Sequence, residues 1–156
     1  MKNGLKVFCS LVFVFTAGMG TSVADGHFDN AIKARKAVMA LYAWNLGQLG
    51  AMAKGDIEYN AEAAQIAAEN IKIMATMNMG SAWPQGSDST ALPGKTRAKV
   101  EAWSTYPESA EINKKLAAAA VAMSDVAGDG VDAVRANIGA IGGACKDCHT
   151  KFREAE

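Results

Sequence analysis

Five consecutive residues near the end of the chain have the types and spacing needed for haem chemistry: Cys145-Lys146-Asp147-Cys148-His149. The spacing Cys-x-x-Cys-His is typical of a c-type haem attachment site. Two thiols three positions apart share one face of a helix and can add to the two vinyl groups of one haem. The adjacent imidazole of His149 can then bind the iron as its proximal ligand. We therefore predict one haem c, held covalently through Cys145 and Cys148.

Two other kinds of site use the same residue types. A dithiol redox centre of the thioredoxin type requires a strand before its first cysteine, and nothing strand-like precedes Cys145. A zinc site would need four ligands, and the mature chain supplies only Cys145, Cys148, His149 and the distant His27. His27 stands at the start of the mature chain, where a solvated histidine is the simpler interpretation. The motif favours haem over both alternatives.

The N-terminus has the pattern of a secretory signal peptide, residues 1–24. Lys2 and Lys6 form a positive start, an apolar run follows, and Ser22-Val23-Ala24 is a small-x-small cleavage site. The apolar part is too short for a membrane span, although an uncleaved anchor is the alternative. We predict a mature haem domain of residues 25–156, exported to the periplasm, where c-type haem is attached.

The charge balance excludes one class of partner. The mature chain keeps 14 basic and 16 acidic residues, for a formal charge of −2, and no basic patch in the sequence indicates nucleic-acid binding. No second apolar run is long enough to span a bilayer.

Apolar residues recur at helical spacing along the whole mature chain. The first helix is expected to begin after Asp29 or Asn30 and to end near Lys54-Gly55. The others are expected at about residues 61–79, 95–104, 108–126 and 131–152, with residues 81–94 as the long loop. The first helix carries a core stripe that includes two unusual members: Phe28, Ile32, Arg35, Met39, Tyr42, Leu46 and Leu49.

The remaining stripes complete the prediction of the fold. In the second helix Ile66, Ile73 and Met77 share one line, and Met74, Met77 and Met79 are interpreted as core filling rather than iron ligands. The third main helix turns four apolar residues inward: Ile112, Leu116, Ala119 and Met123. The last helix places both haem cysteines on its own core stripe: Val131, Val134, Ile138, Ile141, Cys145, Cys148 and Phe152. These patterns predict an all-α, antiparallel up-down-up-down four-helix bundle that encloses the haem.

Arg35 is the charged member of the apolar stripe of the first helix. A guanidinium on an apolar face either reaches solvent or a surface carboxylate, or pairs with a haem propionate. Only seven residues follow His149, so any protein group on the opposite face of the iron must come from upstream.

The chain resembles the class II c-type cytochromes, which include cytochrome c′. The resemblance rests on five segments in the family's order: Arg35-Lys36-Ala37-Val38-Met39, Gly47-Gln48-Leu49, Met52-Ala53-Lys54-Gly55, Pro93-Gly94-Lys95-Thr96 leading to Trp103, and Cys145-x-x-Cys148-His149-x-x-Phe152-Arg153. It implies haem contacts from Arg35, Lys36, Thr96 and Arg97, with Arg153 near the proximal pocket. It also implies a homodimer through the first two helices, for which Tyr42, Trp44 and Leu46 are candidate contacts.

Met39 decides between two functional expectations. In the resembling family the residue four after the first-helix arginine faces the distal side of the iron. The main expectation is a low-spin electron carrier with His149 and Met39 as ligands, working with redox partner proteins. The alternative is a five-coordinate, high-spin protein that binds or buffers nitric oxide or carbon monoxide, with Met39 as a steric plug. A peroxidase-like enzyme would want a distal histidine, which the sequence does not offer, so we predict no enzyme activity.

Overall fold

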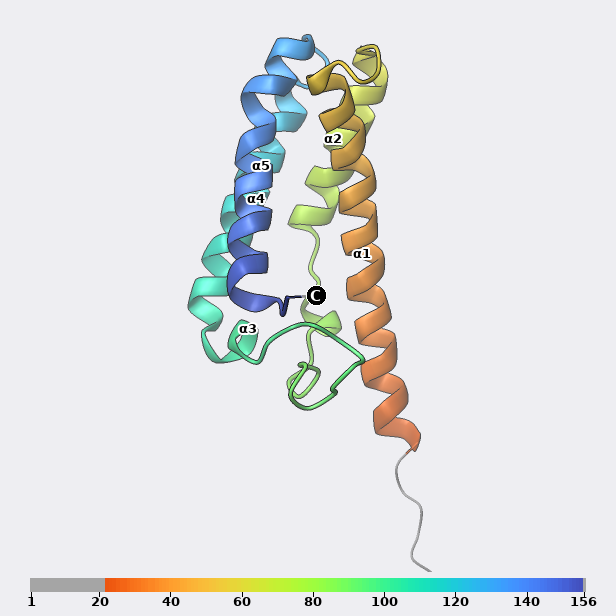
Figure 1. The fold of residues 1–156 in the computed structure, drawn as a ribbon, viewed down its shortest axis with the longest axis vertical. Coiled ribbons are helices and arrows are strands. Elements are labelled where there is room, and N and C mark those ends of the chain that lie inside the picture. The colour runs from red at the N-terminus through yellow and green to blue at the C-terminus, as the bar shows by residue number, and fades with distance from the viewer. Residues whose placement is uncertain (1–21, 156) are drawn as a thin grey trace, which may run out of the picture.

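The computed structural model describes residues 22–155, with side chains described from Phe28 onward (Figure 1). Over this range the backbone is helical or irregular, apart from an isolated antiparallel bridge between Ala98 and Arg153. Four long helices run up and down in sequence and confirm the all-α bundle: α1 Ser22–Lys54, α2 Ala61–Thr76, α4 Tyr106–Val126 and α5 Val131–Phe152. Most of the predicted signal peptide, and its charged start, lies outside the described residues.

Helix α1 starts earlier than the sequence predicted. It begins at Ser22, and neither Asp29 nor Asn30 caps it. No proline interrupts residues 22–30, so nothing in the backbone stops the helix there. The Asp29 carboxylate instead forms an ion pair with Lys95 at 3.0 Å. The predicted end is confirmed, because α1 stops at Lys54 and Gly55 adopts a positive φ of 81° that favours glycine.

The segment between α2 and α4 also differs from the prediction. Helix α2 ends at Thr76 rather than near residue 79, because Met77 is extended with φ −70° and ψ 150°. A short 3-10 turn, η1 (Gly80–Ala82), follows, and the helix predicted from about residue 95 is only α3, Glu101–Ser104. Residues 97–99 instead pair with residues 152–154 at the end of α5. Residues 77–105 therefore form a long connection between α2 and α4 that also reaches the last helix, and we call this segment the connection.

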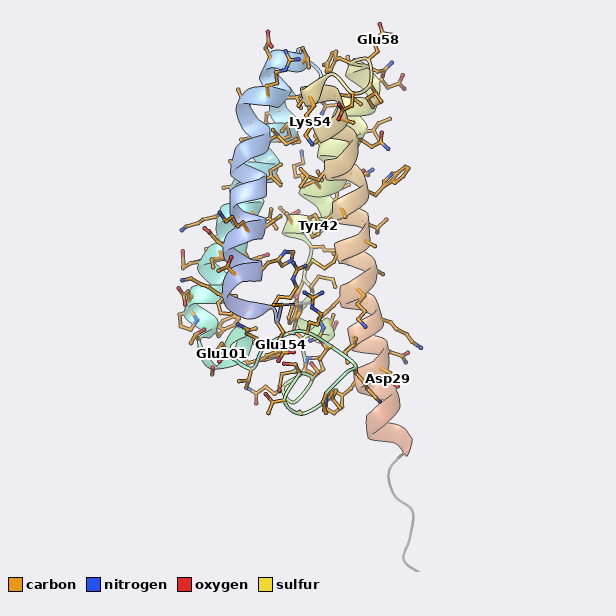
Figure 2. All side chains as sticks on the ribbon, viewed as in Figure 1. Asp29, Tyr42, Lys54, Glu58, Glu101 and Glu154 are labelled. Carbon is orange, nitrogen blue, oxygen red and sulfur yellow. The ribbon has the colours of Figure 1, made fainter. Side chains whose placement is uncertain are left out.

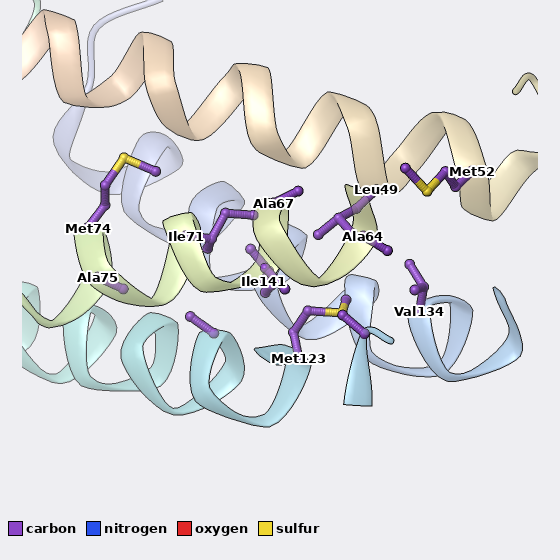
Figure 3. Packing of buried hydrophobic residues seen from close by; sticks show 13 residues of the cluster. Leu49, Met52, Ala64, Ala67, Ile71, Met74, Ala75, Met123, Val134 and Ile141 are labelled. Atoms are coloured by element: carbon purple, nitrogen blue, oxygen red, sulfur yellow. The ribbon is translucent and has the colours of Figure 1, made fainter. Parts of the chain in front are cut away.

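The hydrophobic core fills the end of the bundle where α1 joins α2 and α4 joins α5 (Figure 3). Alanines let the helices approach closely there, and larger side chains fill the remaining space. Leu49, Ile71, Met123, Val134 and Ile141 have 0–1% of their surface exposed. Six alanines are 0–4% exposed: Ala64, Ala67, Ala68, Ala75, Ala120 and Ala127.

The predicted core line of α2 is wrong. Ile66 and Ile73 are 52% and 60% exposed, and Met77 is 38% exposed. The buried line of α2 consists of Ala64, Ala67, Ala68, Ile71, Met74 and Ala75. The physical reason is close packing: small side chains bring α2 against its neighbours, and the larger isoleucines are left on the outer face.

Two turns at the core end are fastened by a tyrosine. The Tyr59 hydroxyl donates to the Ala127 carbonyl oxygen at 2.8 Å and accepts from the Gly130 N–H at 3.0 Å. The opposite end of the bundle carries the long connection and the C-terminal part of α5, with Lys54 and Glu154 marking the two ends in Figure 2. Within residues 22–155, no helix is long and apolar enough to cross a membrane.

Candidate haem site

Helix α5 positions the three residues of the attachment motif in its last two turns. Cys145 and Cys148 are half-buried thiols without a disulfide, and His149 follows directly. Burial raises the pKa of the Cys145 thiol. Burial and the neighbouring Cys145 also raise the pKa of Cys148, and the positive Arg153 opposes this rise. Because the charge of Cys145 affects Cys148 and both thiols are half-buried, the two lie close together on one side of the helix.

Helix α1 faces this pair across the bundle. Tyr42 packs against the core, and its pKa is raised to about 12, first by burial and then by the charge of Cys145. Met39 is one turn before Tyr42 and one turn after Arg35, so all three share a face of α1. Met39 is 43% exposed and is not part of the buried core cluster, and its role as an iron ligand stays a prediction.

Arg35 is buried, with 5% of its surface exposed, and it contacts the long connection. Its guanidinium donates to the Ser87 hydroxyl and to the Ser87 carbonyl oxygen, both at 2.9 Å. It also lies over the Trp83 ring, 4.7 Å from the centroid, and 5.7 Å from the Trp103 centroid. The expectation that Arg35 reaches solvent or a surface carboxylate is therefore wrong. The contact with a haem propionate stays a prediction. The Arg35 guanidinium has five N–H groups, so the two bonds to Ser87 leave donors for such a contact.

The two tryptophans are themselves joined. Their ring centroids lie 5.6 Å apart in a tilted arrangement, and the Trp103 indole N–H donates to the Trp83 carbonyl oxygen at 3.0 Å. Lys36, on the exposed side of α1, donates to the Lys95 carbonyl oxygen at 2.9 Å. These bonds hold the connection against the N-terminal half of α1, beside the site.

The same connection is fastened to the end of α5. The Lys99 N–H donates to the Phe152 carbonyl oxygen, and the Glu154 N–H donates to the Arg97 carbonyl oxygen, both at 2.9 Å. The Arg97 guanidinium donates to the Glu154 carbonyl oxygen at 2.7 and 3.0 Å. Thr96 is buried, and its hydroxyl accepts from the Ala98 N–H at 3.2 Å. Thr96 and Arg97 therefore orient the backbone beside the predicted proximal ligand.

His149 borders a surface hollow of about 630 Å³ that is lined from both segments: Arg97, Lys99, Lys146, His149, Thr150, Arg153, Glu154 and Ala155. Burial, followed by the positive charges of Arg153 and Arg97, lowers the pKa of His149. A lowered pKa keeps the imidazole neutral at neutral pH, and the neutral imidazole is the form that binds a metal ion.

These residues fit a covalently held haem. The donor set is two thiols and a neutral imidazole within one helical turn, half-buried on the last helix, which is the chemistry that thioether attachment and axial ligation need. Cys145 and Cys148 would hold the porphyrin, and His149 would bind its iron. Among the described residues, no group of three or more His, Cys, Asp or Glu side chains is arranged to hold a metal ion, and the His27 side chain lies outside them.

An up-down four-helix bundle with Cys-x-x-Cys-His in the last helix defines a class of haem proteins, the bundle-type c cytochromes. The family model described as cytochrome C′ matches residues 30–153. The chain therefore belongs to the cytochrome c′ family, which binds a covalent c-type haem.

Individual relatives agree with this assignment. The cytochrome c′ of Allochromatium vinosum is 33% identical over 126 residues, covering 80% of each chain. Cytochrome c-554 of Cereibacter sphaeroides is 31% identical over 153 residues, covering 94% of this chain and 95% of its own. A solved cytochrome c′, described as having an unusual ligand-controlled dimer dissociation, superposes with a TM-score of 0.76 at 31% identity. That match covers 82% of this chain and 97% of the other.

The contacts of four residues beside the site were not predicted from the sequence. Ser87 and Trp83 lie in a segment that the sequence marked only as a loop, and no periodicity could place them against Arg35. Trp103 was noted as part of a motif, without a contact. Tyr42 was interpreted as a core residue, and its closeness to Cys145 needed the crossing of α1 and α5.

Proposed function

We propose that this chain is a periplasmic haem protein that binds a small gas, such as nitric oxide or carbon monoxide, at the distal face of a single haem c. Cys145 and Cys148 provide the thioether bonds, and His149 is the proximal ligand. The observation that carries the proposal is the placement of these residues in the last turns of α5, opposite the face of α1 that holds Tyr42 and Met39. The haem would supply the iron that binds the gas.

Membership of the cytochrome c′ family favours gas binding over ligation by Met39. One solved relative at 31% identity is described as having a ligand-controlled dimer dissociation. Such control requires a position in that protein that a ligand can enter. On this reading Met39 stands beside that position as a movable obstacle. Its side chain is long and unbranched, so it can move aside by changing rotamer.

The protein's own residues prepare the proximal side. Arg97 and Arg153 disfavour protonation of His149, so the imidazole is available to the iron at neutral pH. The pairing of residues 97–99 with residues 152–154 holds these guanidinium groups beside His149. Tyr42 is a protonated phenol at neutral pH, and burial raises its pKa further, to about 12.

The second candidate is the electron carrier with His149 and Met39 as axial ligands. It is favoured by one observation: Met39 shares the face of α1 that holds Tyr42, and Tyr42 lies within electrostatic reach of Cys145. Fixed axial ligands would limit rearrangement when the iron changes oxidation state, and a thioether ligand would raise the potential.

The optical spectrum of the ferric protein separates the two candidates. We expect a high-spin ferric spectrum and prompt carbon monoxide binding by the ferrous protein. Met39→Leu should then leave the spin state unchanged and alter only the rate of gas binding. A low-spin ferric spectrum that becomes high-spin in Met39→Leu, but not in the control Met77→Leu, would establish the electron carrier instead. Met77 is a suitable control because it is similarly exposed, at 38%.

The attachment itself has a separate test. In a host that matures c-type cytochromes, the parent protein should keep its colour after denaturation and extraction with acidified acetone. Cys145→Ser with Cys148→Ser should release any pigment into the organic phase. Cys9 lies in the predicted leader, so Cys9→Ser serves as a control that should keep the pigment bound. A folded parent protein without colour would refute the assignment.

We also propose a homodimer through α1 and α2. Leu41, Trp44, Ile66 and Ile73 are 51–67% exposed large apolar side chains on these two helices. Beneath them the Asn70 amide donates to the Asn45 side-chain oxygen at 3.0 Å, which joins the helices. Of the contacts predicted from the sequence, Trp44 stays a candidate at 67% exposure. Tyr42 and Leu46 are corrected, because they pack against the core of their own chain.

A further inference from the structure

The hollow beside His149 has a rim that is more basic than the rest of the protein. Among the described residues, four cationic side chains and one carboxylate line it, although the whole chain has a formal net charge of zero. The cations come from two segments: Arg97 and Lys99 from the connection, and Lys146 and Arg153 from the end of α5. We call this set the basic rim.

The one acidic side chain at the rim is already engaged. The Glu154 carboxylate accepts a hydrogen bond from the Ser89 hydroxyl at 2.7 Å. Lys151, one turn from Lys146, forms an ion pair with Glu108 and does not line the hollow. Lys146 is exposed on α5, so its charge is presented to solvent. Lys146 therefore presents a positive charge at the rim, whereas the neighbouring Lys151 is paired with Glu108.

The rim is also held in a fixed shape. The bridge between Ala98 and Arg153 and the bond from the Lys99 N–H to the Phe152 carbonyl oxygen join its two segments through the backbone. The Arg97 guanidinium is oriented by the Glu154 carbonyl oxygen. A partner would therefore meet a preorganised charge pattern, which lowers the entropy lost on docking.

We propose that the basic rim is the docking surface for an acidic redox protein that delivers single electrons to the haem. The inference rests on the proposed function, because carbon monoxide binds ferrous iron and a ferric protein must first be reduced. In the step, the partner loses one electron and ferric iron becomes ferrous, with no bond formed or broken and no proton required. The rim borders the proximal ligand, so a docked partner lies close to the iron.

The test uses the holoprotein and a plant-type ferredoxin as the acidic probe. Binding of the oxidised ferredoxin is measured by calorimetry at about 10 mM ionic strength, where charges act over about 30 Å. Reduction rates are measured separately with reduced ferredoxin and with a neutral flavin semiquinone generated by a light flash. The variant Lys99→Gln with Lys146→Gln removes two rim charges. The control Lys54→Gln with Lys72→Gln removes the same charge from α1 and α2, with Lys54 at the far end of the bundle (Figure 2).

We expect the rim variant to weaken ferredoxin binding about fivefold to tenfold and to slow reduction by ferredoxin by a similar factor. Reduction by the neutral flavin should not change, which excludes an altered potential or a misfolded site. Raising the ionic strength should reduce the difference between parent and rim variant. Equal weakening in the control variant, or parent binding that is absent or independent of salt, would overturn the proposal. A colourless protein would instead overturn the proposed function.

Discussion

Arg35 offers the sharpest test of how the site is held together. Replacing it with methionine keeps an unbranched side chain in a 5% exposed position and removes the guanidinium. The substitution loses two hydrogen bonds to Ser87 and the contact with the Trp83 ring. Hydrogen bonds from a charged donor contribute about 1.5–3 kcal/mol each, and a cation–π contact contributes about 0.5–2 kcal/mol.

These contributions are not additive, and methionine recovers part of the apolar contact. We therefore expect Arg35→Met to lower the free energy of unfolding by about 3 kcal/mol. For a domain of this size that corresponds to a fall of about 10 °C in the melting temperature, followed by far-UV circular dichroism. The near-UV signal of the tryptophans should also weaken, because Trp83 and Trp103 lose the cation between them.

Two controls isolate the cause. Arg35→Lys keeps the charge but not the planar fork, so it should still lose most of the stability. Lys36→Met, on the adjacent exposed position with a single bond to the Lys95 carbonyl oxygen, should change the free energy of unfolding by less than about 1 kcal/mol. If Arg35→Met stays within about 1 kcal/mol of the parent and keeps its near-UV spectrum, Arg35 does not hold the connection and the reasoning is refuted.

Three further predictions concern the rest of the bundle. Tyr59→Phe removes the hydroxyl that joins the Ala127 carbonyl oxygen and the Gly130 N–H, so it should lower the free energy of unfolding by about 1–2 kcal/mol in a denaturant titration. Gly130→Ala should lower the free energy of unfolding by about 1–3 kcal/mol, because φ is 132°. An added Cβ meets no atom within 4 Å, so the loss would come from backbone strain, and an unchanged denaturation midpoint would show that this strain is negligible. Trp44→Glu should convert the proposed dimer to a monomer in light scattering without changing the helical content, since this side chain is 67% exposed; a dimer that persists would place the interface elsewhere.

The fold could be predicted because its signals are local. Helical periodicity, Gly55 and the glycine-rich turn before Val131 fixed the main helices to within a few residues, apart from the start of α1 at Ser22. The stripe of α5 was also correct, since Val134, Ile141 and Phe152 are buried and both cysteines are half-buried beside them. Helix α2 was harder, because its buried face consists mostly of alanines, which carry little hydrophobic signal.

The site could be predicted only in part. The spacing of Cys145, Cys148 and His149 identified the attachment chemistry because all three residues lie in one short segment. The contacts of Arg35 with Ser87 and Trp83 join residues about fifty positions apart through an irregular segment, which no repeating pattern describes. The basic rim likewise depends on the pairing of residues 97–99 with residues 152–154, which the sequence analysis assigned to separate helices.

The location of the alanine-rich core has a consequence for motion. The largest buried cluster lies toward the end of the bundle that contains Leu49, Ile71 and Val134, whereas the segment beside the end of α5 is irregular and is joined to it by backbone hydrogen bonds. Amide protons near the cofactor should therefore exchange with solvent sooner than those in the buried cluster, and small local openings should be concentrated near the cofactor. A diatomic molecule could then reach the iron through brief loosening of one end while the other end keeps the four helices in register.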